Sequence, residues 1–251
     1  SKPDKATGLV RLEGVISNSA GSVVDDVITE LQQAFGDERI VAVILAINSP
    51  GGSPVQSSYI NTEIGRLRTK FPKKPLYVVI EDICASGGYF VASAATQIFA
   101  NESSLIGSIG VRFDAFGFVE TLEKLGIERR LLTAGKHKGI FDPFLPTKSG
   151  DETHIQGLLE EIHQHFISVV KSGRDTKLKN PDEVFSGLIW TGKKSLELGL
   201  IDGLGSIDYV AREVVKVEKI INFTREKFPW ENALKNAVMS LTSNWSKFSI
   251  W

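Results

Sequence analysis

The chain has 251 residues, of which 42% are hydrophobic, and its 29 basic residues nearly balance its 30 acidic ones. This length and composition suffice to bury one substantial core or two small ones, so a soluble globular domain is the default expectation. Charges of both signs are interspersed and the formal net charge is −1, which excludes the basic face that a nucleic-acid-binding protein needs. We therefore expect no nucleic-acid partner.

The cysteine content and the apolar runs exclude further classes. Cys84 is the single cysteine, so the chain has no intrachain disulfide and lacks the cysteine spacing of a zinc site. The longest strongly apolar stretch, residues 40–47, is far shorter than the roughly 20 residues that cross a membrane as a helix. The N-terminal residues are polar, and the sequence as given is therefore expected to carry neither a signal peptide nor a membrane anchor.

Strands and helices are predicted to alternate through the first half of the chain. The expected elements are a strand over 8–16, a helix over 22–35, a strand over 40–47, a helix over 55–69, a strand over 76–81, a helix over 89–95, strands near 97–100 and 107–113, and a helix over 119–125. The strands are continuous apolar runs. That pattern is typical of a parallel sheet covered by helices, so the predicted fold class is α/β.

The second half of the chain is predicted to be mainly helical. Residues 133–150 are rich in Gly, Pro, Lys and Asp and predict a functional loop, which a long helix over 150–172 follows. A second helical region is expected over 191–219. Between 228 and 251, apolar residues at steps of three or four predict one apolar helix face, for packing or for contact between subunits. We divide the chain into a domain over 1–221 and a C-terminal helical extension over 222–251.

Ser86 lies where an apolar strand breaks into small residues before a predicted helix. A serine in such a turn is a candidate nucleophile, because the backbone N–H groups at the start of a helix can bind an oxyanion. Its hydroxyl group needs a neighbouring base. His137 is one candidate base, in a triad with Asp142 or Asp114. Lys138 is the other, provided that the site excludes water so that the amine can give up its proton.

The remaining histidines and the cysteine carry weaker signals. We place His154, His163 and His165 on the surface of the long predicted helix, where no metal site is expected because the helix turns neighbouring side chains to different sides. Cys84 is interpreted as a small buried apolar residue with no catalytic role. No cofactor is expected.

Five segments in matching order resemble the signal peptide peptidase A family of serine proteases. They are the INSPGG loop at 47–52, the ASGGYF turn at 85–90, the run NESSLIGSIGV at 101–111, the GKHKG loop at 135–139 and the run WTGKKSLELGLIDGLG at 190–205. The match covers most of the chain. Each segment alone is a weak signal, and their joint order carries the resemblance.

The resemblance implies a fold like that of Clp protease and crotonase, a spiral of parallel β-sheet with covering helices. It also implies that Ser86 is the nucleophile and Lys138 the general base of a Ser-Lys dyad. Ser108 matches a family serine that orients the lysine amine. The alternative for Ser108 is a serine that merely completes its own turn.

The resemblance implies that backbone N–H groups of glycines bind the oxyanion. These are the N–H of Gly87 and that of Gly51 or Gly52, with Gly52 preferred over Gly51. Glycines let a peptide carbonyl approach the backbone, and a turn after Pro50 can aim successive N–H groups into one pocket.

The family further implies an activity, an assembly and a location. The expected activity is that of a serine endopeptidase that degrades short, largely apolar peptides such as released signal peptides. Ring-like homo-oligomers, tetramers or octamers, are expected, in which serine and lysine can come from adjacent subunits. Membrane association is expected through an N-terminal anchor that this sequence lacks, with the protease domain outside the cytoplasm. Two other classes stay open: a crotonase-type acyl-CoA hydratase or isomerase, and a non-enzymatic membrane-associated scaffold.

Overall fold

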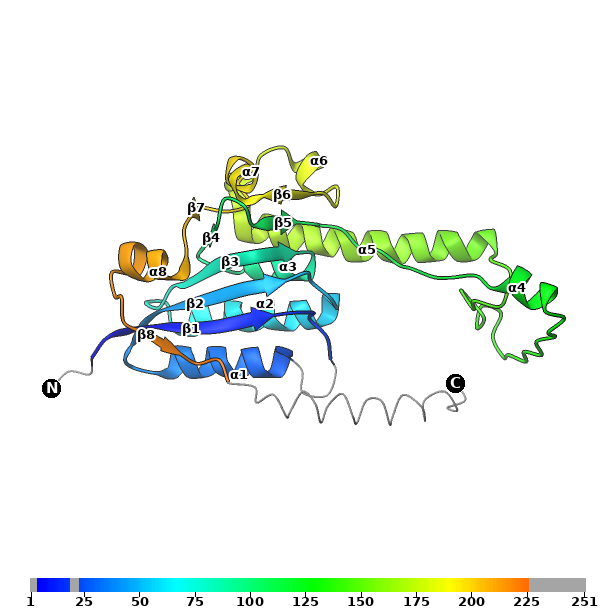
Figure 1. Cartoon of the computed structure of the whole chain (residues 1–251), viewed down its shortest axis with the longest axis horizontal. Coiled ribbons are helices and arrows are strands. Elements are labelled where there is room, and N and C mark those ends of the chain that lie inside the picture. Colours follow the sequence, from blue (N-terminus) through cyan, green and yellow to red (C-terminus); the bar gives the residue numbers. More distant parts are fainter. Residues whose placement is uncertain (1–3, 19–22, 226–251) are drawn as a thin grey trace.

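Residues 4–18 and 23–225 are described by a computed structural model of the chain, and the C-terminal helix expected over 228–251 lies outside them (Figure 1). The strands are β1 (Ala6–Glu13), β2 (Ile40–Ser49), β3 (Leu76–Ala85), β4 (Gln97–Ala100), β5 (Leu105–Gly107), β6 (Ile189–Thr191), β7 (Gly203–Leu204) and β8 (Ile220–Asn222). The helices are α1 (Val23–Gly36), α2 (Pro54–Lys70), α3 (Gly87–Ala92), α4 (Val119–Lys124), α5 (Ser149–Arg174), α6 (Pro181–Val184), α7 (Gly192–Glu197) and α8 (Ile207–Tyr209), with a 3₁₀ turn at Asp175–Lys177 and a π-helical turn at Val210–Val215.

The strands of the described residues form one sheet, in the order β6-β5-β3-β2-β1-β8, with β4 beside β3 and β7 beside β4. Neighbouring strands run parallel, except that β5 and β6 are antiparallel. Because β3 is long, residues 77–80 pair with β4 and residues 83–85 pair with β5. The predicted α/β class with a mainly parallel sheet is confirmed.

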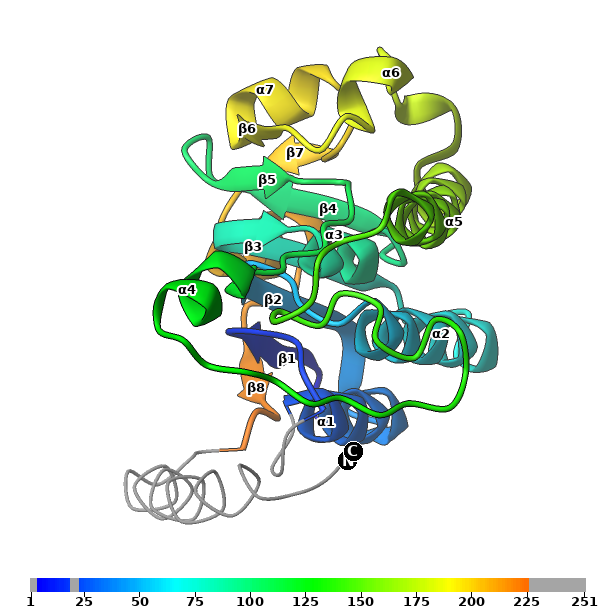
Figure 2. The same ribbon diagram turned by 90° about the vertical axis from the view of Figure 1, so that its right-hand side faces the viewer.

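The central strands are covered on both faces. Helices α1, α2, α3 and α5 enclose the main core on one face, and Figure 2 shows α1, α2 and α5 on that side of the sheet. On the other face, Leu9, Ile44 and Val79 form a smaller core against the π-helical turn. Double coverage explains why residues 40–47 of β2 are all apolar, since neither face of that strand meets water over most of its length.

Three predicted strands and one predicted helical region differ from the structure. β3 runs on to Ala85 instead of ending at residue 81. β1 ends at Glu13, before Gly14 takes a φ of +79°, and the strand expected near 107–113 is instead β5, which ends at Gly107, where φ is +122°. These backbone angles turn the chain out of the sheet although the apolar pattern continues. Residues 191–219 are not one helical region, because they contain α7, β7, α8 and the π-helical turn, and β7 pairs with β4.

The last described residues complete one edge of the sheet. β8 lies beside β1, and the amide of Phe223 donates to the carbonyl of Leu9 at 2.8 Å. The amide of Arg11 donates to Thr224 Oγ1 at 2.9 Å. The boundary predicted after residue 221 therefore falls within β8, and the chain stays on the sheet beyond it.

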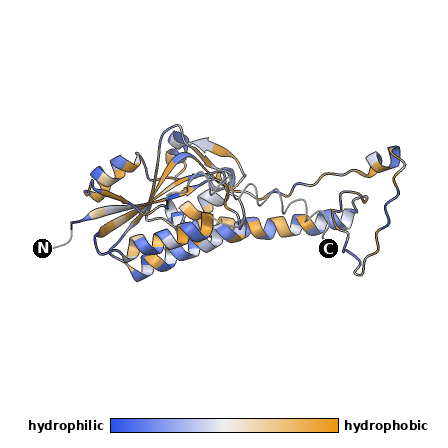
Figure 3. Cartoon of the chain, turned by 60° about the horizontal axis from the view of Figure 1, so that its bottom comes forward, coloured by the Kyte–Doolittle hydropathy of each residue, from blue (hydrophilic) through white to orange (hydrophobic). Residues whose placement is uncertain are grey.

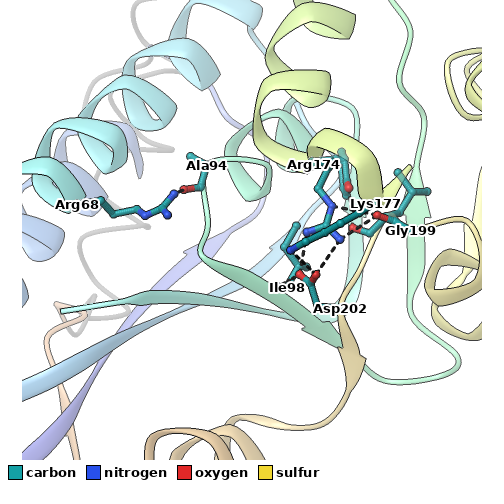
Figure 4. Close-up of polar contacts among 9 residues, drawn as sticks. Arg68, Ala94, Ile98, Arg174, Lys177, Gly199 and Asp202 are labelled. Atoms are coloured by element: carbon teal, nitrogen blue, oxygen red, sulfur yellow. Dashed lines mark hydrogen bonds and ion pairs between the residues drawn. The ribbon is translucent and has the colours of Figure 1, made fainter. Parts of the chain in front are cut away.

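Arg174 anchors the C-terminal end of α5 through a buried ion pair with Asp202 (Figure 4). Its Nη1 donates to Asp202 Oδ2 at 2.7 Å, and its Nε and Nη2 donate to the carbonyl of Gly199 at 3.0 and 2.8 Å. Asp202 also accepts hydrogen bonds from Lys177 Nζ and from the amide of Ile98, both at 2.8 Å. The network joins α5 to β4 and to the loop before β7.

The chain between β5 and α5 leaves the sheet and runs beside α5 to the N-terminal end of that helix. Figure 1 shows this stretch, which carries α4, projecting beyond the sheet together with the first part of α5. We call residues 113–158 the arm. Figure 3 shows polar and apolar residues intermixed along the arm.

Asp202→Asn is expected to lower the free energy of unfolding by about 3–5 kcal/mol, because it leaves the charged Arg174 guanidinium buried without its partner. Urea denaturation followed by circular dichroism measures this loss. Glu128→Gln breaks an exposed pair with Arg130, at 3.0 Å, and should cost no more than about 1 kcal/mol. Equal losses in the two variants would contradict the buried role of Asp202.

The same ion pair predicts a pH dependence. Burial raises the pKa of Asp202, but hydrogen bonds from Arg174 and Lys177 outweigh burial and hold that pKa below its ordinary value of 3.8. The carboxylate therefore stabilises the fold fully above the unfolded-state pKa, and this contribution is lost as pH falls through the folded-state pKa. The difference in unfolding free energy between wild type and Asp202→Asn should be constant from about pH 7 to about pH 5 and shrink below about pH 4. A difference that stays constant down to the lowest pH at which both proteins are folded would argue against this.

Candidate active site

Ser86 joins the end of β3 to the start of α3. Its backbone has a φ of +52° and a ψ of −122°, a conformation that is uncommon outside glycine and recurs at functional turns. The Ser86 amide donates to the Gly107 carbonyl at 2.8 Å, and the Ser86 carbonyl accepts from the amides of Tyr89 and Phe90. The Ser86 side chain does not cap α3, so these backbone bonds hold the turn without using the hydroxyl group.

The loop between β2 and α2 lies in backbone contact with the Ser86 turn. A Cβ atom on Gly51 would lie 2.7 Å from the Gly87 amide nitrogen and 2.8 Å from Ser86 Cβ, so only glycine fits there. The Gly51 amide donates to Ser49 Oγ at 3.1 Å, and Ser49 Oγ donates to the Gly14 carbonyl at 2.6 Å. The Gly51 N–H is therefore already engaged within the loop.

The amides of Gly52 and Gly87 are neighbours beside Ser86. The Gly52 nitrogen lies 3.3 Å from the position that a Cβ would take on Gly87. Within residues 4–18 and 23–225, neither amide donates to a backbone carbonyl. Both glycines line the groove that contains Ser86. Two such N–H groups beside a serine hydroxyl can bind the oxyanion of an acyl-transfer reaction.

The groove around Ser86 has a volume of about 850 Å³, and both apolar and polar residues line it. Its apolar lining residues are Val15, Pro50, Pro54, Phe90, Val111, Ile162 and Phe166. Ser108 lines the groove too, with a φ of +52° and its amide donating to the Leu188 carbonyl at 2.7 Å. The position of Ser108 thus fits both of its predicted roles, because it shares the groove with Ser86 and also completes a turn.

Lys138 does not line this groove, and within the described part of the chain no interaction joins it to Ser86. Lys138 is exposed in the arm, where its amide donates to the Gly135 carbonyl at 3.1 Å. Figure 1 shows the arm extending well beyond β3 and α3. In one chain, the two predicted dyad residues are therefore not in contact.

His137 also lies in the arm and does not line the groove. Its Nδ1 is 3.3 Å from Asp151 Oδ1, and its side chain is 63% exposed. Asp142 and Asp114, the two acids considered for a triad, are each paired with an arginine instead. A triad of Ser86, His137 and either acid is therefore not formed within the described chain.

Two of the histidines that were predicted on the surface line the groove, and one of them, His165, is exposed as predicted. His163 is half-buried and its Nε2 lies 3.1 Å from the Ile109 carbonyl oxygen, so this nitrogen carries a proton and donates it. The His165 ring centroid is 5.7 Å from that of Phe90. Spacing offered a signal for His163, because it precedes Phe166 by three residues and therefore shares the helix face that packs against Phe90 of α3.

The structure gives Cys84 and His154 no contact with the groove that contains Ser86. Cys84 is buried, and burial raises the pKa of its thiol far above the ordinary range. His154 is exposed, as predicted. Among the described residues, no three His, Cys, Asp or Glu side chains are grouped so as to hold a metal ion. No described helix combines the length and apolar character needed to cross a bilayer.

A family match decides the assignment. Residues 68–221, more than half of the chain, match peptidase family S49. The chain belongs to peptidase family S49. The matched span contains Ser86, Gly87, Ser108 and Lys138, whereas the Gly51 loop precedes it.

Three relatives illustrate what this S49 family member is similar to. A Brucella abortus protein named Na(+)/H(+) antiporter NhaA is 45% identical over 204 residues, which cover 79% of this chain and 28% of that protein. Putative protease MJ0651 of Methanocaldococcus jannaschii is 30% identical over 186 residues, 74% of this chain and 59% of that protein. A putative signal peptide peptidase SppA of Enterococcus faecium is 27% identical over 226 residues, 89% of this chain and 63% of that protein. The chain thus spans less than two thirds of each relative, and the family and protease names support a serine protease.

Gly51→Ala is expected to lower the free energy of unfolding by about 2 kcal/mol or more and to impair the site, because its Cβ would collide with backbone atoms at 2.7–2.8 Å and φ there is +100°. Gly65→Ala, in α2, meets nothing within 4 Å and should stabilise the protein by up to about 1 kcal/mol. Chemical denaturation compares the two. Retention of full stability by Gly51→Ala would show that the two loops are not packed as described.

Proposed function

We propose that this S49 family member is a serine endopeptidase in which Ser86 attacks the carbonyl carbon of a peptide bond. The position of Ser86 carries the proposal. Its strained turn places it in a groove large enough for an extended peptide, next to the amides of Gly52 and Gly87.

The reaction proceeds through an acyl-enzyme. Ser86 Oγ bonds to the carbonyl carbon while its proton passes to a base, and the N–H groups of Gly52 and Gly87 stabilise the negative charge that forms on the carbonyl oxygen. The C–N bond then breaks, and the base returns the proton to the leaving amine. Water adds to the acyl-enzyme in the same way, which releases the carboxylate product and restores the Ser86 hydroxyl group.

The proposed base is Lys138 of a neighbouring copy of the chain. In each copy, the arm holds Lys138 exposed and away from the groove of the same copy. The Lys138 of one copy can therefore reach the Ser86 of another. His163 is the alternative base inside the groove. Its Nε2 proton is committed to the Ile109 carbonyl, and within the described residues no hydrogen bond joins it to Ser86.

Exposed apolar side chains support an assembly built through the arm. Those in the arm that are more than about a third exposed are Phe113, Phe116, Phe118, Leu125, Ile127, Leu131, Leu132, Phe144 and Leu158. Val15, Val55 and Tyr59, on or near the loops beside the groove, are exposed as well. Apolar surface of this extent marks a contact with another molecule. We propose a ring-like homo-oligomer in which each arm covers the groove of the next copy.

The seven apolar residues of the groove favour short, largely apolar peptides as substrates. Released signal peptides belong to this class, and the Enterococcus faecium relative is named for them. Association of the protein with a membrane, where such peptides are released, remains a prediction.

Ser86→Ala and Lys138→Ala are each expected to reduce kcat/KM for an apolar fluorogenic peptide by at least about a thousandfold. A fluorophosphonate should label Ser86 of the wild type. Lys136→Ala, two residues away in the same loop, should keep turnover within a few-fold and serves as the matched control. An acyl-CoA hydratase or isomerase would instead bind a thioester and escape labelling. Full turnover by either of the first two variants would remove that residue from the dyad.

Mixing the two inactive variants tests which copy supplies the lysine. In randomly mixed oligomers of Ser86→Ala and Lys138→Ala chains, about a quarter of the sites should combine an intact serine with an intact lysine of the neighbour, so about a quarter of wild-type activity should return. Mass spectrometry of the intact assemblies verifies mixing. Verified mixed oligomers without activity would place both residues in one chain, and loss of turnover in His163→Gln but not in Lys138→Ala would make His163 the base.

A further inference from the structure

The groove that contains Ser86 carries charge of one sign. Among the described residues that line it, the ionisable side chains are Arg112, His163 and His165, and none is acidic. A second groove of about 670 Å³ lies on the opposite face of the sheet and is lined by Arg11 together with four acidic side chains. Charge is therefore separated between the two grooves, although the whole chain is nearly neutral.

Arg112 has donors left for a ligand. Its Nε lies 3.3 Å from Asp114 Oδ2, and both side chains are largely exposed, so this pair holds the guanidinium only weakly. A guanidinium has five N–H donors, most of which this contact does not use. The bond from the Ser86 amide to the Gly107 carbonyl fixes the start of the segment that carries Arg112. The Arg112 backbone thus lies at most about 18 Å, the span of about five extended residues, from Gly107, the residue to which Ser86 is hydrogen-bonded.

His165 reaches the groove from α5 and packs beside the helix that follows Ser86. Its ring packs beside Phe90, one turn of α3 after Ser86, while the residue stays largely exposed. Its ring nitrogens can therefore meet a substrate group near the cleaved bond. His163 is not assigned to substrate binding, because its Nε2 already donates to the Ile109 carbonyl and so joins α5 to the segment after β5.

We propose that the groove selects peptides that carry a carboxylate within about five residues of the cleaved bond, and disfavours Lys and Arg there, with Arg112 and His165 as specificity-determining residues. The carboxylate is that of an Asp or Glu side chain or of the C-terminus of the peptide. Charge-assisted hydrogen bonds from Arg112 attract it, whereas a substrate cation finds no acidic partner among the described lining residues. The inference rests on the proposed endopeptidase function and narrows its substrates.

A matched peptide series tests the inference. An uncharged apolar fluorogenic peptide, amidated at its C-terminus, is the parent, and Glu, Gln or Lys replaces one residue at a time over five positions on each side of the cleaved bond. At one position or more, kcat/KM should be about fivefold higher for Glu than for Gln, and lower again for Lys. The parent peptide with a free C-terminus, compared with the amidated parent, tests whether a C-terminal carboxylate raises kcat/KM in the same way.

Variants assign the preference to its residues. The ratio of kcat/KM for the Glu peptide to that for the Lys peptide should fall toward one in the double variant Arg112→Gln/His165→Gln. Arg212→Gln, in an exposed pair on the opposite face, should leave this ratio unchanged. The same peptides are measured for binding to Ser86→Ala by fluorescence anisotropy. Cleavage of the parent reports the endopeptidase function, and the ratios report the charge preference. Equal rates and affinities for Glu, Gln and Lys in the wild type, or a ratio that the double variant retains, would overturn the inference.

Discussion

The site depends on one close backbone contact, that between the Gly51 loop and the Ser86 turn. Two parallel neighbours, β2 and β3, end side by side, and the register between them shifts after Ile47, just before both loops begin. No side chain fits between the loops at Gly51, so the Gly52 and Gly87 amides come to lie together. The closeness of these two amides is thus a product of sheet geometry, and the oxyanion site that we propose there would exist before any substrate binds.

A second constraint connects the Ser86 turn to the rest of the molecule. Tyr89, in the first turn of α3, donates its hydroxyl proton to the Leu200 carbonyl at 2.6 Å. Leu200 follows Gly199, which Arg174 binds, and precedes Asp202 by two residues. The helix that starts at Ser86 and the helix that carries the arm are therefore tied to the same short loop.

Local order could be predicted from the sequence, whereas the meeting of distant residues could not. Continuous apolar runs indicated the parallel strands, and the small residues around Ser86 indicated its turn, because both signals arise from neighbours in the chain. His163 was misplaced because it was assigned to solvent as a polar residue, although its spacing of three from Phe166 puts it on the buried face of the helix. Residues 191–219 read as helical, yet pairing of β7 with β4 overrode that propensity. Lys138 is the extreme case, because the motif around it gives no sign that the arm holds it exposed and away from the groove of its own chain.

The length of α5 bears on how activity relates to assembly. Its 26 residues make a rod of about 39 Å that is anchored near its C-terminal end, so a tilt of about 5° at the anchor moves the other end by about 3 Å. That displacement equals the length of a hydrogen bond. If the base is carried on a neighbour's arm, an isolated copy is folded but has no base beside Ser86. The number of active sites then falls when dilution separates the copies. Peptide held across the boundary between two copies would in turn strengthen their association, because the linkage between ligand binding and assembly is reciprocal.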